Sequence, residues 1–276
     1  MIVDGSFAPA RFGLLGLERT ADARYRFEVR PDLSTPFGNL YGGVGAAACA
    51  EAAEGVIGRP LQWMTTQFIG SAGSPDVVDL EVITRAHGRA TSQAEVVGTV
   101  AGRPVFTSLC AHTRRPAGDR AQFVDMPDVT GPHDCDPASD PFADTPPGAF
   151  VDAMERRRAT SSAGADAHGS CDPGRVTLWC RIRGDVIGSP ATQAFVSDIV
   201  PLAVCSALGI PATGTSLDNT VRIIDTDPSE WVLLDMYPDG FHRATGHGSL
   251  RVWSEDGRLM ATAQQSTIIR LGELDV

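Results

Sequence analysis

The chain has 276 residues, of which 42% are hydrophobic and 21% charged, a profile typical of a soluble globular protein with one or two domains. Its net charge of −11 argues against a nucleic-acid binder, because such proteins need a basic surface to neutralise phosphates. The sequence shows neither an apolar run of bilayer length nor a secretory start, and no C-x-x-C pair, so we expect a cytoplasmic protein without metal or cofactor.

The first predicted element is a helix over residues 42–58, which is rich in alanine and glycine and ends at Gly58 before Pro60. A β-meander is predicted after it. An extended segment over 77–83 is followed by an alternating segment after GRAT at 88–91, a tight turn at 101–103 and a strand ending near Arg115. Residues 116–148 are dense in Pro, Asp and Gly, so they are interpreted as a linker that buries little surface.

The second half repeats this order. A helix is predicted over 189–209, with Ser189 as its N-cap and Pro190 in its first turn, and Pro201 is expected to kink or open it. Strands follow at 231–237, after HRAT at 242–245, and after the turn at 256–258. The ordered match indicates a duplicated α+β domain with boundaries at 1–115, 116–148 and 149–276, each half a sheet wrapped on a central apolar helix.

Several short motifs resemble those of the acyl-CoA thioesterase II family. They are Tyr41-Gly42-Gly43 ahead of the first helix, Ser197-Asp198 within the second, Ser216-Leu217-Asp218 before a strand, and Asp256-Gly257 through Gln265 to Arg270. The resemblance covers about residues 30–115 and 145–271. It implies a double hotdog fold, in which two hotdog domains of one chain join their sheets and lay their helices side by side. The implied activity is hydrolysis of acyl-CoA, and the family's habits together with exposed sheet edges favour a homo-oligomer.

Matched motif to motif, the family's water-holding carboxylate, hydroxyl and amide correspond to Asp198, Ser216 and Gln265. Asp198 suits a general base, and the other two groups suit the positioning of a water molecule. Gly42 and Gly43 suit an oxyanion site or close helix packing, since neither carries a side chain. The family more usually has threonine at Ser216 and histidine at Asn219.

The first half places no such polar trio at matching positions. The residues opposite Ser216, Gln265 and Asp198 are predicted to be Gln62, Cys110 and, within a residue or so, Ala52. We therefore expect one active site, built from the start of the first helix and the trio of the second half. Glu51 and Glu54 lie near the equivalent of Asp198, and a structural or solvent-facing role is favoured for both.

Two other functions fit the same fold. A hotdog hydratase or dehydratase would need a paired Asp and His, and no D-x-N-P-x-H-like segment is present. A non-catalytic acyl-CoA or lipid-binding protein is disfavoured by the polar trio. Arg156, Arg157 and Arg158 could contact the coenzyme's phosphates, although a solvated strand end is the favoured interpretation.

Overall fold

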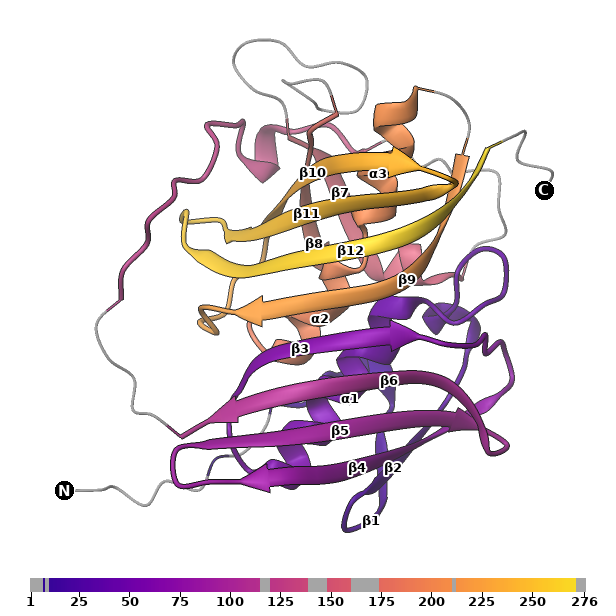
Figure 1. Ribbon diagram of the computed structural model, residues 1–276. Helices are drawn as coiled ribbons and strands as arrows, with labels where there is room; N and C mark the ends of the chain where they lie inside the picture. Colours follow the sequence, from indigo (N-terminus) through magenta and orange to yellow (C-terminus); the bar gives the residue numbers. More distant parts are fainter. Residues whose placement is uncertain are drawn as a thin grey trace.

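The computed structural model describes residues 7, 10–114, 120–138, 148–159, 174–209 and 212–271. These residues form one 12-stranded antiparallel sheet, in the order β1-β2-β4-β5-β6-β3-β9-β12-β11-β10-β8-β7 (Figure 1). The strands of the first half are β1 (Glu18–Ala21), β2 (Arg24–Glu28), β3 (Leu61–Phe68), β4 (Val77–His87), β5 (Thr91–Val100) and β6 (Arg103–Thr113). Those of the second half are β7 (Met154–Arg158), β8 (Val176–Ile182), β9 (Ala212–Ile223), β10 (Val232–His242), β11 (Thr245–Ser254) and β12 (Leu259–Leu271).

The helices lie behind this sheet, on its concave side (Figure 1). Helix α1 (Gly42–Ile57) is buried almost throughout and ends at Gly58, which adopts the left-handed conformation that favours glycine. The second helical segment is divided into α2 (Pro190–Ser197) and α3 (Val200–Leu208). Ser189 caps α2 by accepting a hydrogen bond from the Thr192 N–H, as predicted. The predicted opening near Pro201 is also confirmed.

The two halves meet through a strand pair and a helix pair. Strand β3 pairs antiparallel with β9, and a hydrogen bond of 2.7 Å joins the hydroxyls of Thr65 and Thr220 at their centre. Helices α1 and α2 pack against each other across the same boundary. A sheet wrapped on a central helix, twice over in one chain and joined edge to edge, is the double hotdog architecture expected from the sequence.

The internal symmetry extends to a β-bulge, and it corrects one predicted match. The register of β3 shifts between Leu61 and Trp63, and that of β9 shifts at the same place, between Ser216 and Asp218. Leu61, rather than Gln62, therefore lies opposite Ser216. The bulged residues Gln62 and Leu217 match each other, so the alignment made from the sequence was one position off along this strand. Cys110 is the equivalent of Gln265, as predicted. Cys110 pairs with Met64 in the first half, as Gln265 pairs with Asn219 in the second.

The predicted linker is not a loose connection. Residues 120–138, named here the strap, cross the outer face of β8, β10 and β11 and cover a second apolar core. Met126 and Val129 of the strap pack on it, and the Trp179 indole N–H donates to the Thr130 carbonyl at 2.8 Å. This outer core consists of Ala159, Trp179, Trp231, Leu233 and Trp253. Most side chains of the strap are exposed, as expected of a linker, but Met126, Val129 and Cys135 are partly buried on this core.

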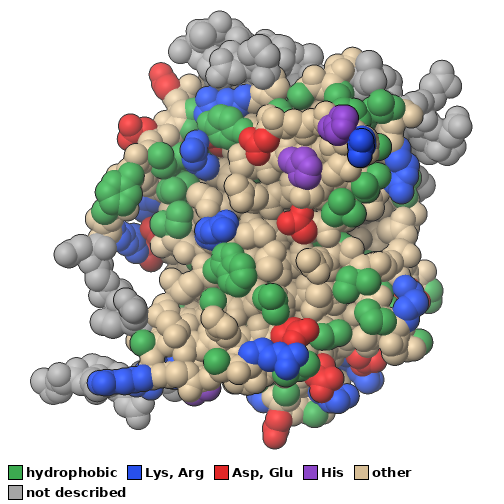
Figure 2. Space-filling view, in the orientation of Figure 1, with side chains coloured by type: hydrophobic (Ala, Val, Ile, Leu, Met, Phe, Trp, Pro, Cys, Tyr) green, Lys and Arg blue, Asp and Glu red, His purple; other side chains and the backbone are tan. Residues whose placement is uncertain are grey.

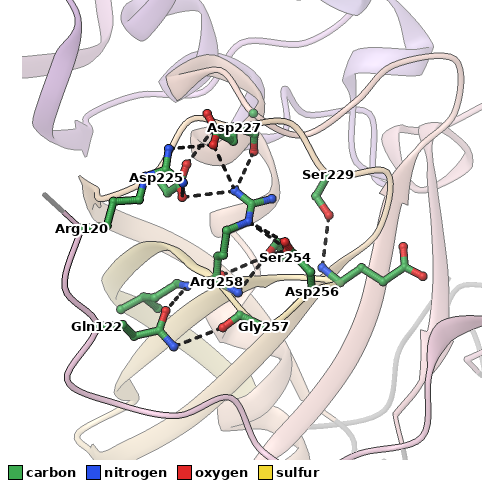
Figure 3. A network of polar contacts seen from close by, with 12 residues as sticks. Arg120, Gln122, Asp225, Asp227, Ser229, Ser254, Asp256, Gly257 and Arg258 are labelled. Carbon is green, nitrogen blue, oxygen red and sulfur yellow. Dashed lines mark hydrogen bonds and ion pairs between the residues drawn. The ribbon is translucent and has the colours of Figure 1, made fainter. Parts of the chain in front are cut away.

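Charged groups fix the start of the strap. Arg120 contacts Asp225 and Asp227, with N–O distances of 2.9 and 2.7 Å, and Arg258 joins the same group (Figure 3). Gln122 donates to the Gly257 carbonyl next to it. Such partly exposed pairs add little stability one by one, but as a network they hold the strap in register on the second half.

Among the residues that the structure describes, only the strap covers the outer face of the sheet. Figure 2 shows this face with mostly uncharged polar side chains and backbone near its centre. The homo-oligomer expected from the sequence stays a prediction. Residues 190–208 are long and apolar enough to cross a membrane by length and composition, but 67% of that stretch is buried inside the fold, as the core helix of a soluble protein would be.

Candidate active site

Asp198, Ser216 and Gln265 lie together, although the sequence separates them widely. The Ser216 hydroxyl donates to Oδ1 of Asp198 at 3.0 Å. The amide nitrogen of Gln265 donates to the same carboxylate oxygen and also to Ser216 Oγ, the latter at 2.7 Å. The structure therefore unites the three predicted polar groups in one hydrogen-bonded cluster.

The break between α2 and α3 places Asp198 in this cluster. Pro201 has no N–H to donate, and its ring would collide with the carbonyl of Ser197 in a continuous helix. The helix therefore stops at Ser197, and Asp198 and Ile199 adopt non-helical conformations. The carboxylate is consequently presented from a break in the backbone rather than from the side of a helix.

Gln265 is oriented from behind. Its carbonyl oxygen accepts a hydrogen bond of 3.2 Å from the Val200 N–H, which opens α3. That bond fixes which end of the amide points at Asp198, because a reversed amide would bring its NH2 group against the Val200 N–H and place two donors face to face. Gln265 is buried and does not line the cavity beside the cluster, whereas Asp198 and Ser216 do. Its structural role is thus to hold the pair that faces the cavity.

Gly42 and Gly43 bring the start of α1 against the carboxylate. A Cβ on Gly42 would overlap Oδ2 of Asp198, and one on Gly43 would overlap the Phe195 carbonyl and the Tyr41 ring. Helix α1 has no side-chain N-cap of its own, and the Gly43 N–H is a hydrogen-bond partner of the Asp198 carboxylate. A carboxylate at the positive end of a helix is favourable. The glycines are therefore required for close packing between the two halves.

The pKa of Asp198 is raised to about 7. Burial is the main cause, because it removes the charged form from water, and hydrogen bonds from Ser216, Gln265 and the Gly43 N–H oppose it. A carboxylate with a pKa near neutrality can both accept and return a proton at working pH.

Two further residues of the site were not singled out from the sequence. The Tyr41 hydroxyl donates to the carbonyls of Phe195 and Asp198, at 3.0 and 2.9 Å, and so clamps the broken helix to α1. Asn219 is buried beside Asp198 and lowers its pKa. Only the Tyr-Gly-Gly motif hinted at the first, and Asn219 was noted only as a departure from the family's histidine.

The cluster opens into a cavity of about 1350 Å³. Phe68 and Phe106 line it on the side of the first half, and Leu178, Leu202 and Cys205 on the side of the second. Most of these walls are apolar, so the cavity suits a ligand with a hydrocarbon part. It lies where the two halves meet, next to the exposed faces of Asp198 and Ser216.

In the first half, a tyrosine side chain packs closely against α1. The Tyr25 hydroxyl of β2 rests on Gly55 of α1, where even a Cβ would overlap it. Counted from the N-caps Tyr41 and Ser189, Asp198 matches Ala50, close to the predicted Ala52. The first half thus lacks the matching carboxylate.

Glu51 and Glu54 have structural roles, as favoured from the sequence. Glu51 accepts a hydrogen bond of 2.9 Å from the Phe12 N–H, and Glu54 accepts one of 2.8 Å from the Leu61 N–H. Burial raises the pKa of Glu54 to about 7. Neither glutamate lines the cavity beside Asp198.

Fold and site together define a class, the double hotdog proteins with a carboxylate at the helix break. A model of the acyl-CoA thioesterase C-terminal domain matches residues 132–269. A candidate thioesterase from Novosphingobium aromaticivorans is 32% identical, with a TM-score of 0.84 over 95% of this chain and 100% of that one. This chain belongs to the acyl-CoA thioesterase II family.

More distant structures share the fold. A TesB protein of Mycobacterium avium subsp. paratuberculosis is 20% identical with a TM-score of 0.76, over 94% of this chain and 97% of that one. The acyl-CoA thioesterase II TesB2 of Mycobacterium marinum is 18% identical with a TM-score of 0.73, over 93% and 96%. No curated protein matches the chain.

Proposed function

We propose that this protein hydrolyses acyl-CoA thioesters to a free carboxylic acid and coenzyme A, using a water molecule activated by Asp198. The observation that carries the proposal is the hydrogen-bonded cluster of Asp198, Ser216 and Gln265 facing an apolar cavity. A buried carboxylate held in this way at a cavity wall is costly unless it is used.

In this mechanism the water lies in the cavity between Asp198 and Ser216. Asp198 takes one proton as the oxygen attacks the thioester carbonyl, and the carbon–sulfur bond then breaks to release the thiolate of coenzyme A. The proton held by Asp198 passes to that thiolate, which restores the carboxylate. The Gly42 N–H at the start of α1 is the proposed donor to the developing oxyanion, since Gly42 lines the cavity at the positive end of the helix.

The test is thiol release from a panel of acyl-CoA thioesters of increasing chain length, with the wild type, Asp198→Asn and Glu51→Ala. We expect release by the wild type, a loss of about 10²- to 10⁴-fold in kcat for Asp198→Asn, and activity close to the wild type for Glu51→Ala. The asparagine keeps the size of the side chain and its acceptor oxygen, so it removes the base with little change in packing.

Two results would contradict the proposal in different ways. Tight acyl-CoA binding without release at any chain length would indicate a binding protein. Loss of turnover in Glu51→Ala with activity retained in Asp198→Asn would move the active site to the first half.

A further inference from the structure

Positive side chains outnumber negative ones among the described residues that line the cavity. Three arginines, Arg156, Arg158 and Arg270, contribute to its walls, and Asp198 is the only acidic side chain among the described lining residues. The whole chain, in contrast, carries a net charge of −11. A locally positive cavity in an acidic protein binds an anionic ligand more favourably than the rest of the protein surface does.

Strand alternation explains which arginines of β7 face the cavity. Met154 points into the main core, so Arg156 and Arg158 share its face of the strand. Arg157 points to the opposite face, where it bonds Glu155 and the Pro132 carbonyl and lies over the Trp231 ring. The run of three arginines is therefore divided between a structural contact outside and the cavity inside.

Arg158 is the cavity arginine best placed to bind a ligand. Its backbone is fixed, because its N–H donates to the Asp136 carbonyl at 3.0 Å and β7 pairs with Leu178 of β8. Its guanidinium forms no ion pair with any described residue, whereas Arg156 already interacts with another part of the protein. A guanidinium held at the wall of a partly enclosed cavity offers a planar pair of donors that matches a phosphate group.

We propose that Arg158, with Arg156 beside it, forms an anion-binding end of the cavity that takes a phosphate group of coenzyme A. This inference rests on the proposed acyl-CoA hydrolysis and assigns recognition of the coenzyme to β7 of the second half. The apolar walls near Asp198 then take the acyl group, and the arginines bind the charged part of the same substrate.

The experiment compares thioesters that carry the same acyl group on coenzyme A, on 3′-dephospho-coenzyme A and on pantetheine, which has no phosphate. We expect Arg158→Gln to lower kcat/KM for acyl-CoA about tenfold, mainly through KM, and to leave acyl-pantetheine within about twofold of the wild type. If the effect vanishes with the dephospho compound, Arg158 binds the 3′-phosphate; if it persists, Arg158 binds the diphosphate.

The matched control is Arg24→Gln, which removes the same charge from an exposed pair with Glu81 in the first half. It should leave all three values unchanged, which excludes a general effect of net charge. Equal loss for acyl-CoA and acyl-pantetheine, or no loss for either, would overturn the proposal. So would a loss seen only with pantetheine thioesters whose acyl group ends in a carboxylate, because the anion would then belong to the acyl group. A wild type that hydrolyses none of the thioesters would instead contradict the proposed function.

Discussion

At the scale of single residues, the site depends on a carboxylate that is kept out of water. Three side chains and one backbone N–H surround Asp198, yet burial still raises its pKa to about 7. The resemblance to the family selected Asp198, Ser216 and Gln265, whereas strand alternation alone requires only that one of Gln264 and Gln265 face inward. Resemblance and alternation were not enough to find Tyr41, because it reaches the site only through packing between the halves, or Asn219, which the pairing of β9 with β12 places beside Gln265.

The raised pKa predicts the pH dependence of catalysis. Because the base must be ionised, kcat should rise with pH through an apparent pKa near 7 in the wild type. Glu54→Gln is the control, since Glu54 has a similar pKa of about 7 but bonds the Leu61 N–H away from the cavity. Initial rates from pH 5 to 9 should show the same acid limb in the wild type and in this variant. An acid limb that moves or vanishes in Glu54→Gln would contradict the prediction, because the titrating group would then be Glu54 and not Asp198.

The same shift has a consequence for stability, with a definite sign. A carboxyl whose pKa is higher in the folded than in the unfolded state loses its contribution to folding as pH rises through the folded value. Ionised Asp198 should therefore destabilise the fold above pH 7. The free energy of unfolding, measured in urea, should increase for Asp198→Asn relative to the wild type as the pH is raised from 4.5 to 8.

At the scale of elements, the break between α2 and α3 gives the site its geometry. The sequence located this break, because a proline inside an apolar helix removes a hydrogen bond and collides with the preceding turn. It did not indicate that Asp198 itself would lie in the break. Strands β1, β2, β7 and β8 were also not predicted; β1 and β7 are short and charged, and the nearly continuous burial of β8 gives no alternation.

Pro201→Ala tests whether the break serves catalysis. Alanine restores the N–H that can bond the Ser197 carbonyl, so α2 can continue into α3 and turn Asp198 away from Ser216 and Gln265. We expect kcat to fall at least about tenfold while the free energy of unfolding changes by less than about 1 kcal/mol. Pro190→Ala, in the first turn of α2, is the matched control and should leave kcat unchanged. Equal kcat in both variants would show that the break is only a packing feature.

At the scale of the whole molecule, the two halves are alike in fold and unequal in use. The first half has Ala50 where the second half has Asp198, and the strap adds an outer core to the second half. The duplication was readable from the sequence because its turns and strands recur in order. The strap was not, because its composition is that of a linker, and the common face of Trp179, Trp231 and Trp253 that it covers appears only in the folded sheet.

Trp179→Phe tests how firmly the strap is held. Phenylalanine keeps most of the apolar contact but loses the hydrogen bond to the Thr130 carbonyl, which should lower the free energy of unfolding by about 1 kcal/mol. Local opening of the strap should rise with it, so trypsin should cut faster after Arg120, as followed by mass spectrometry of the native protein. Trp63→Phe, on β3 outside the outer core, should leave that cleavage unchanged.

Because the strap also pairs with β7 through Pro137 and Arg157, its loosening should raise KM for acyl-CoA if β7 positions the coenzyme. Faster cleavage with an unchanged KM would mean that β7 keeps its place without the strap.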